Sequence, residues 1–226
     1  MTRAWKFLDE RGRGMVTGFA WPLPAGPDEA GGWVEANGPL EVCGRGVHAC
    51  RADDLAWWLS AQLWEIEIDG AVLQDDPHTL VAERGRLVAR VAGWPAVGPD
   101  LARWAVERTR RHAVSVLRAL GPTADPAVSP ADAGALEGCA DLDELAAVAA
   151  RLADHPHPDA AMAAALVADN LADLPNPVEA CHTSARAAGH HGSIGGSPAD
   201  YEQAFAAERR AQSRWLADRL GLLTPG

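Results

Sequence analysis

The first part of the chain alternates apolar and polar residues with the period of a β-strand. The clearest run is LWEIEIDG (63–70), in which Trp64, Ile66 and Ile68 fall on one face and the acidic side chains on the other. Glycine and proline interrupt such runs at short intervals, as they do between short strands. Three further runs have the same character: WKFLDE (5–10), LEVCGRGVHAC (40–50) and RLVARV (86–91). Together they predict a small, twisted and mostly antiparallel sheet.

One short helix lies between these strands, and longer helices follow them. RADDLAWWLSAQ (51–62) carries Asp53 and Asp54 in its first turn, where the helix dipole favours negative charge. After about residue 97 the apolar spacing changes to the helical period, beginning with a helix over 99–121. Four more helices are expected, at 141–153, 158–173, 177–190 and 198–220.

The change of period predicts an α+β fold with two domains. A β-rich domain over 1–97, with the sheet and the short helix, is followed by an α-helical domain over 98–226. Two segments are expected to separate helices. One is the Pro-rich segment 121–134, and the other is GHHGSIGG (189–196), whose four glycines predict a mobile loop.

Charge and composition narrow the range of partners. The formal net charge of −11 argues against nucleic acid and anionic membranes, because both require a basic protein surface. No apolar run has the length of a signal peptide or a membrane span, so a cytoplasmic protein is expected. In that compartment its four cysteines are reduced. Lys6 is the only lysine, and this preference for arginine indicates a GC-rich genome.

The segment CGRGVHAC (43–50) is the strongest candidate for a chemical site. Cys43, His48 and Cys50 are three zinc-binding side chains, but a structural zinc site needs four ligands and usually a closer cysteine pair. Zinc is therefore kept as an alternative, and the prediction is that no metal or other cofactor is bound. The second interpretation treats both cysteines as small buried residues and His48 as a hydrogen-bonded anchor between strands.

The order of strand, Gly-Arg-Gly turn, GVHAC, short helix and strand resembles the central part of the ADP-ribosyltransferase fold. The resemblance implies an enzyme acting on an NAD-type substrate, with His48 at the ribose and Trp57 or Trp58 stacked on nicotinamide. It implies Glu83 as the catalytic carboxylate, with Glu65 or Glu67 as alternatives. The Ser-Thr-Ser and tyrosine elements of that family have no counterpart at these positions.

Two further resemblances cover larger parts of the chain. About the first 95 residues resemble a family of uncharacterised bacterial and phage domains, which share Cys-x-x-Gly-hydrophobic-His-x-Cys after a lysine-bearing strand and a Gly-Phe turn. The matching residues are Lys6, Gly18, Phe19, Cys43, Gly46, His48, Cys50, Glu65, Val81 and Ala82. In the second half, LARWAVERTRRHAVSVL and ACHTSARAAGHHG are similar to helical immunity proteins of actinobacteria, which implies a protein partner.

The helical half places one acid on an apolar face. The stripe along 198–220 includes Glu208, and a buried carboxylate is costly unless it is paired. Its candidate partners are Arg108, His112 and His182. Such a cluster either binds a ligand between helices or forms a hydrogen-bonded network that fixes their packing, and the network is favoured.

These observations favour a cytoplasmic accessory or binding protein. Its small-molecule or partner site is expected in a Trp-lined cleft between the two domains, where pockets commonly form. The candidate ligand-binding residues are His48, Trp57, Trp58, Arg45, His182 and Glu208. Whether the protein is an enzyme stays open, with His48, Glu65 and Glu83 as catalytic candidates. An ADP-ribosyltransferase-like enzyme and a helical immunity-type interaction module are the alternative functions.

Overall fold

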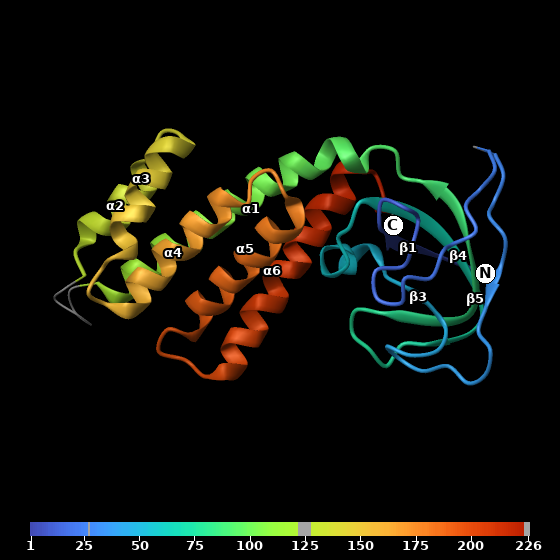
Figure 1. Ribbon diagram of the computed structural model, residues 1–226. Helices are drawn as coiled ribbons and strands as arrows, with labels where there is room; N and C mark the ends of the chain where they lie inside the picture. The colour runs from blue at the N-terminus through green and yellow to red at the C-terminus, as the bar shows by residue number, and fades with distance from the viewer. Residues whose placement is uncertain (27, 122–127, 224–226) are drawn as a thin grey trace. The chain divides into compact units, whose positions relative to one another are not determined.

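The chain forms two compact units, shown with their secondary structure in Figure 1. The computed structural model describes residues 1–26, 28–121 and 128–223. The N-terminal unit comprises Met1–Val97 together with the chain from Ser213 onward, and the helical unit comprises Gly98–Gln212. The boundary between the units therefore falls close to residue 97, where the apolar period changes.

The end of the last helix groups with the N-terminal unit, whereas the sequence pattern assigned everything after residue 97 to the helical part. Leu216 and Ala217 are fully buried, so this segment contributes to a core rather than to a surface. The Ser213 hydroxyl accepts the backbone N–H of Ala56 at 2.9 Å. A local sequence pattern does not predict a hydrogen bond between two residues that lie so far apart in the chain.

The N-terminal unit is built on a five-stranded antiparallel sheet with the order β1-β4-β5-β2, in which β3 also pairs with β5. Its strands are β1 (Thr2–Leu8), β2 (Val34–Glu35), β3 (Val47–Ala49), β4 (Gln62–Leu73) and β5 (Leu80–Arg90). The short 3-10 helix η1 (Ala52–Trp57) follows β3. The predicted α+β class and the small antiparallel sheet are confirmed.

β4 shows how the alternating pattern folds. Ile66 and Ile68 are buried in the sheet core, while the acidic residues that alternate with them are only half-buried. Glu65 accepts a hydrogen bond from Arg3 of β1 at 2.8 Å. Register shifts at two points along the β4–β5 pairing interrupt the regular ladder, and such irregularities increase the local twist of a sheet.

In the part of the chain that the structure describes, six α-helices follow the sheet, and Figure 1 shows their arrangement. They are α1 (Trp94–Leu120), α2 (Pro130–Gly138), α3 (Leu142–Ala153), α4 (Pro158–Ala172), α5 (Pro177–Ser193) and α6 (Pro198–Arg219). Side chains of Asp141, His157 and Asn176 cap the starts of α3, α4 and α5 by accepting backbone N–H groups. The core of the helical unit is rich in alanine, leucine and valine. Within the described residues, no helix combines the length and the apolarity needed to cross a membrane.

The prediction of a mobile loop at 189–196 is wrong for its first part, because α5 continues to Ser193. Gly189 lies inside the helix and against the ring of Tyr201. A Cβ atom at this position would come within 2.6 Å of the Tyr201 ring. This glycine therefore permits a close approach between α5 and α6 and does not mark a turn.

The Pro-rich segment 121–134 was expected to be a loop, but its second part begins α2. Ser129 and Asp132 form a capping box around the start of this helix, and Pro130 occupies its first turn, where proline is tolerated. Residues 122–127 of the expected loop lie outside the described residues.

Candidate ligand-binding pocket

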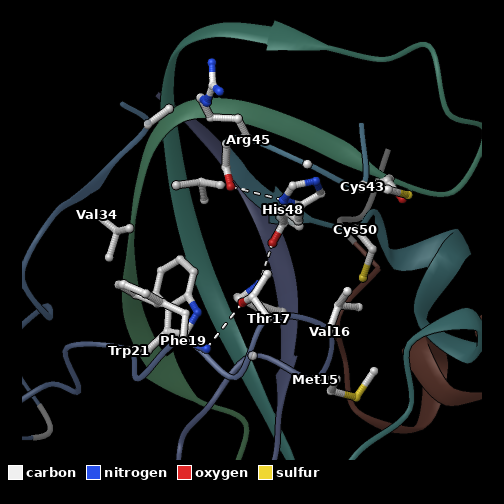
Figure 2. Close-up of a pocket in the computed structure, with 18 of the residues that line it drawn as sticks. Met15, Val16, Thr17, Phe19, Trp21, Val34, Cys43, Arg45, His48 and Cys50 are labelled. Atoms are coloured by element: carbon white, nitrogen blue, oxygen red, sulfur yellow. Dashed lines mark hydrogen bonds between the residues drawn. The ribbon is translucent and has the colours of Figure 1, made fainter. Parts of the chain in front are cut away.

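A pocket of about 370 Å³ opens in the N-terminal unit, and every residue that lines it belongs to that unit (Figure 2). The volume lies within the range of small-molecule sites, roughly 300–1,000 Å³. Its walls come from β1, β2, β3 and the segments that precede β2 and β3. Much of the wall is apolar or aromatic, including Trp5, Met15, Val16, Phe19, Trp21 and Val34.

A short apolar hairpin, residues 14–19, forms one side of this pocket. The backbone N–H of Gly14 donates to the carbonyl of Phe19 at 2.9 Å, and Gly18 adopts a positive φ of 66° at the turn. Met15, Val16 and Phe19 are 43%, 77% and 46% exposed. Three large apolar side chains in one short turn leave apolar surface in water beside the opening, which favours binding of an apolar partner.

Lys6 of β1 lines the pocket, and its surroundings shift the pKa of its ammonium group. The ammonium donates one hydrogen bond, to the carbonyl oxygen of His48 at 2.7 Å, and lies 4.8 Å from the centre of the Trp21 ring. No carboxylate of the described residues forms an ion pair with it. Burial lowers the pKa of Lys6 to about 8. The group is therefore a half-buried, partly desolvated ammonium, and two of its three donors have no partner among the described residues.

The turn before β3 explains the Gly-Arg-Gly sequence. Gly46 has a φ of 136°, and a Cβ atom there would come within 2.4 Å of a Val81 methyl group on β5. Cys43 is exposed in the same turn with a φ of 57°, while Cys50 is buried beyond the strand. Arg45 is exposed and lines the pocket. The sequence thus places one cysteine at the surface and the other in the core.

His48 also lines the pocket, on β3 opposite Val81 of β5. Its Nδ1 atom is 3.1 Å from the carbonyl oxygen of Gly46, and its buried Nε2 atom has no hydrogen-bond partner among the described residues. Burial lowers the pKa of His48, so the ring is neutral at pH 7. Burial also raises the pKa of the Cys50 thiol, which keeps that group protonated. Across the described part of the chain, no group of three or more His, Cys, Asp or Glu residues is arranged to hold a metal ion.

The paired tryptophans lie differently from each other. Trp58 lines the pocket and donates its indole N–H to the carbonyl of His78 at 2.9 Å. Trp57 stacks on the His78 ring, with the ring centres 3.8 Å apart, and is not among the lining residues that the structure describes. The two rings therefore do not form one aromatic clamp.

The catalytic carboxylate candidates lie elsewhere in the sheet. Glu65 pairs with Arg3, as described above. Glu83 on β5 is exposed and accepts the backbone N–H of Ala71 at 2.9 Å. Neither is among the described residues that line the pocket, so His48 and these two acids do not meet there.

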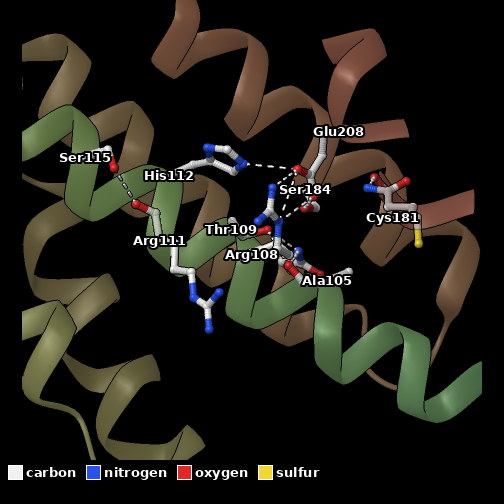
Figure 3. Close-up of polar contacts among 11 residues, drawn as sticks. Ala105, Arg108, Thr109, Arg111, His112, Ser115, Cys181, Ser184 and Glu208 are labelled. Carbon is white, nitrogen blue, oxygen red and sulfur yellow. Dashed lines mark hydrogen bonds and ion pairs between the residues drawn. The ribbon is translucent and has the colours of Figure 1, made fainter. Parts of the chain in front are cut away.

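Glu208 lies in the helical unit, at the centre of a hydrogen-bonded network (Figure 3). Its side chain is 1% exposed and accepts hydrogen bonds from Arg108, from His112 at 3.3 Å and from Ser184 at 2.9 Å. Burial alone would raise its pKa, but the hydrogen bonds from His112 and Arg108 outweigh burial and hold the pKa at about 2. His182 is exposed and contacts Arg209 at 3.2 Å instead. Of the three expected partners, two therefore contact Glu208.

Sequence reasoning missed two parts of the pocket, Lys6 and the apolar hairpin. Lys6 is the only lysine among the 20 lysines and arginines, but composition alone does not connect this residue with a pocket. The hairpin was visible as Met15 and Val16 enclosed by glycines in GRGMVTGF, a run without strand or helix period.

The chain matches no family model, no curated protein and no solved structure in the comparisons made with each. Its function is therefore inferred from the geometry of the pocket and from the chemistry of the side chains that line it.

Proposed function

We propose that the N-terminal unit is a small-molecule-binding domain whose ligand lies in the pocket beside the apolar hairpin. The observation that carries this proposal is the pocket itself, about 370 Å³ in volume with mostly apolar and aromatic walls and a few polar groups. The exposed side chains of Met15, Val16 and Phe19 beside it support a ligand with a flat, apolar body. A cytoplasmic setting is part of the proposal, and the four free cysteines are consistent with it.

Binding is preferred to catalysis because of how the reactive groups lie. Glu65 and Glu83 have partners outside the pocket, and the pKa of the Cys50 thiol is raised by burial. A thiol is a weak nucleophile while it is protonated. The helical unit offers less support for a separate binding function, because its buried acid Glu208 already has protein partners.

The proposal is tested with a neutral, flat probe, naphthalene-1-methanol, titrated into the protein labelled with 15N. We expect the largest amide shifts in the hairpin 14–19 and in the segment 43–50. Phe19→Ala should weaken binding about fivefold to twentyfold, because it removes apolar contact area. Leu23→Ala is the matched control, since Leu23 is 47% exposed, close to the 46% of Phe19, and does not line the pocket. Equal effects of the two substitutions, or shifts confined to the helical unit, would contradict the proposal.

A further inference from the structure

We propose that the ligand of this pocket is a flat organic carboxylate, and that its carboxylate pairs with the Lys6 ammonium while its apolar body lies against Trp21 and the hairpin. This inference rests on the proposed binding function and names the chemical class of the ligand.

The Lys6 ammonium is incompletely solvated by the protein. A lysine ammonium has three donors, and among the described residues Lys6 uses one of them, on the carbonyl oxygen of His48. The face of the Trp21 ring offers a cation–π contact but accepts no full hydrogen bond. A desolvated positive charge without an anion is costly, so an anionic ligand would gain more here than at the surface.

The charge of the pocket differs in sign from that of the chain as a whole. The protein has a formal net charge of −11, yet two cations, Lys6 and Arg45, line this pocket together with one carboxylate, Glu35. Glu35 is exposed and does not pair with Lys6. Burial lowers the pKa of His48 and raises that of Cys50, so neither of these lining groups supplies a negative charge that would compensate Lys6. The pocket therefore attracts anions although the molecule as a whole repels them.

The basic residue at position 6 is a lysine and not an arginine. Every other basic residue among the 20 lysines and arginines is arginine, so the chain uses lysine only where it lines this pocket. A lysine ammonium is a compact point charge on a flexible stem, whereas a guanidinium is larger and planar. The Lys6 ammonium lies between the Trp21 ring and the His48 carbonyl, and as a compact point charge it can turn its remaining donors toward a ligand oxygen in the pocket.

The single lysine also makes the experiment simple. Protein labelled with 13C at lysine Cε gives one side-chain signal, which reports the charge of Lys6 directly. It is titrated at pH 7 with 1-naphthoate and with naphthalene-1-methanol, which share the same rings and differ in charge. We expect 1-naphthoate to bind about tenfold or more tightly than the alcohol. In its presence the pKa of Lys6 should rise from about 8 toward its ordinary value of 10.5.

A substitution assigns the effect to Lys6. Lys6→Met keeps the length of the side chain and should reduce the affinity for 1-naphthoate to that for the alcohol, with the alcohol itself little affected. Arg90→Met is the control, because it removes an exposed positive charge of β5 outside the pocket and should leave the ratio of the two affinities unchanged. The pKa measurement on the unsubstituted protein stays decisive even when a variant folds poorly.

Each outcome has one meaning. Equal affinities for the two probes would overturn the carboxylate inference and leave the binding function standing. A preference for 1-naphthoate that survives Lys6→Met would also overturn it, because the attraction would then come from Arg45. Failure of both probes to bind would overturn the inference together with the proposed function.

Discussion

The two units differ in how the protein compensates a charge that is partly or wholly removed from water. In the helical unit, the Arg108 guanidinium contacts both oxygens of Glu208, and His112 and Ser184 complete the solvation of that carboxylate. In the N-terminal unit, the Lys6 ammonium has one carbonyl oxygen and the face of an aromatic ring. The first charge is compensated within the protein, and the second has no counter-charge among the described residues.

Burial of a polar group does not by itself indicate a functional site. Glu208 is more deeply buried than Lys6, yet its hydrogen-bond partners compensate its charge. The packing of the helices therefore explains why this acid is buried. Lys6 has no such charge-compensating partner among the described residues, and the proposed ligand carboxylate would supply the missing counter-charge.

Breaking the compensated pair should have the largest effect. Glu208→Ala leaves Arg108 without its carboxylate and should lower the free energy of unfolding by about 2–4 kcal/mol. Glu107→Ala is the control, because Glu107 pairs with Arg110 and Arg111 on a more exposed face of α1 and should cost less than about 1 kcal/mol. Urea unfolding curves measure both. A similar loss in the two variants would mean that the Glu208 network contributes no more than a surface ion pair.

Acid should weaken the same network in a defined range. The pKa of Glu208 is held at about 2, below its ordinary value of 4.5, so the unfolded chain takes up this proton before the folded protein does. The stabilisation is therefore complete above about pH 4.5 and is lost as the pH falls toward about 2. Unfolding curves of the parent protein and Glu208→Gln should differ most near neutral pH and converge in acid. A constant difference across this range would contradict the assignment.

The contrast between the units also separates what sequence predicts from what it does not. Strand β4 and helices α3 to α6 follow from local periodicity, because each element buries one face of its own sequence. The sequence predicts loops at the first part of α2 and at the end of α5, because proline and glycine usually indicate breaks. In the structure Pro130 starts a helix and Gly189 packs against Tyr201.

The site was predictable only in part, for a similar reason. His48, Arg45 and Trp58 belong to one local motif, and all three line the pocket. Lys6 lies 42 residues before His48 and reaches it because β1 and β3 lie side by side, with Trp5 paired to Cys50. Such a contact depends on the register of several strands, and no local pattern in the sequence specifies it.

Removing the uncompensated charge should have a smaller effect of opposite sign. Lys6→Met should raise the free energy of unfolding at pH 7 by about 1 kcal/mol, because it removes a desolvated cation and keeps its apolar stem. The pKa of Lys6 is about 8 in the folded protein and 10.5 ordinarily, so the folded protein loses this proton first. The cost of the lysine is therefore complete below about pH 8 and diminishes as the pH rises toward 10.5. Unfolding curves at pH 7 and pH 9.5 should show the advantage of methionine shrinking. A destabilised variant at pH 7 would identify Lys6 as a structural anchor.

The smallest effect on stability is expected at His48, although this residue lies next to Lys6 in the pocket. Its Nδ1 atom contacts only the Gly46 carbonyl within its own turn, and its Nε2 atom has no hydrogen-bond partner in the described part of the chain. The backbone pairing of β3 with β5 and the acceptor for Lys6, which is the His48 carbonyl, both remain in His48→Ala. The free energy of unfolding should therefore fall by less than about 1 kcal/mol, with an unchanged urea slope. A loss of about 2 kcal/mol or more at the same slope would show that the imidazole holds β3 in place, and His48 would then belong to the scaffold of the pocket and not to its binding surface.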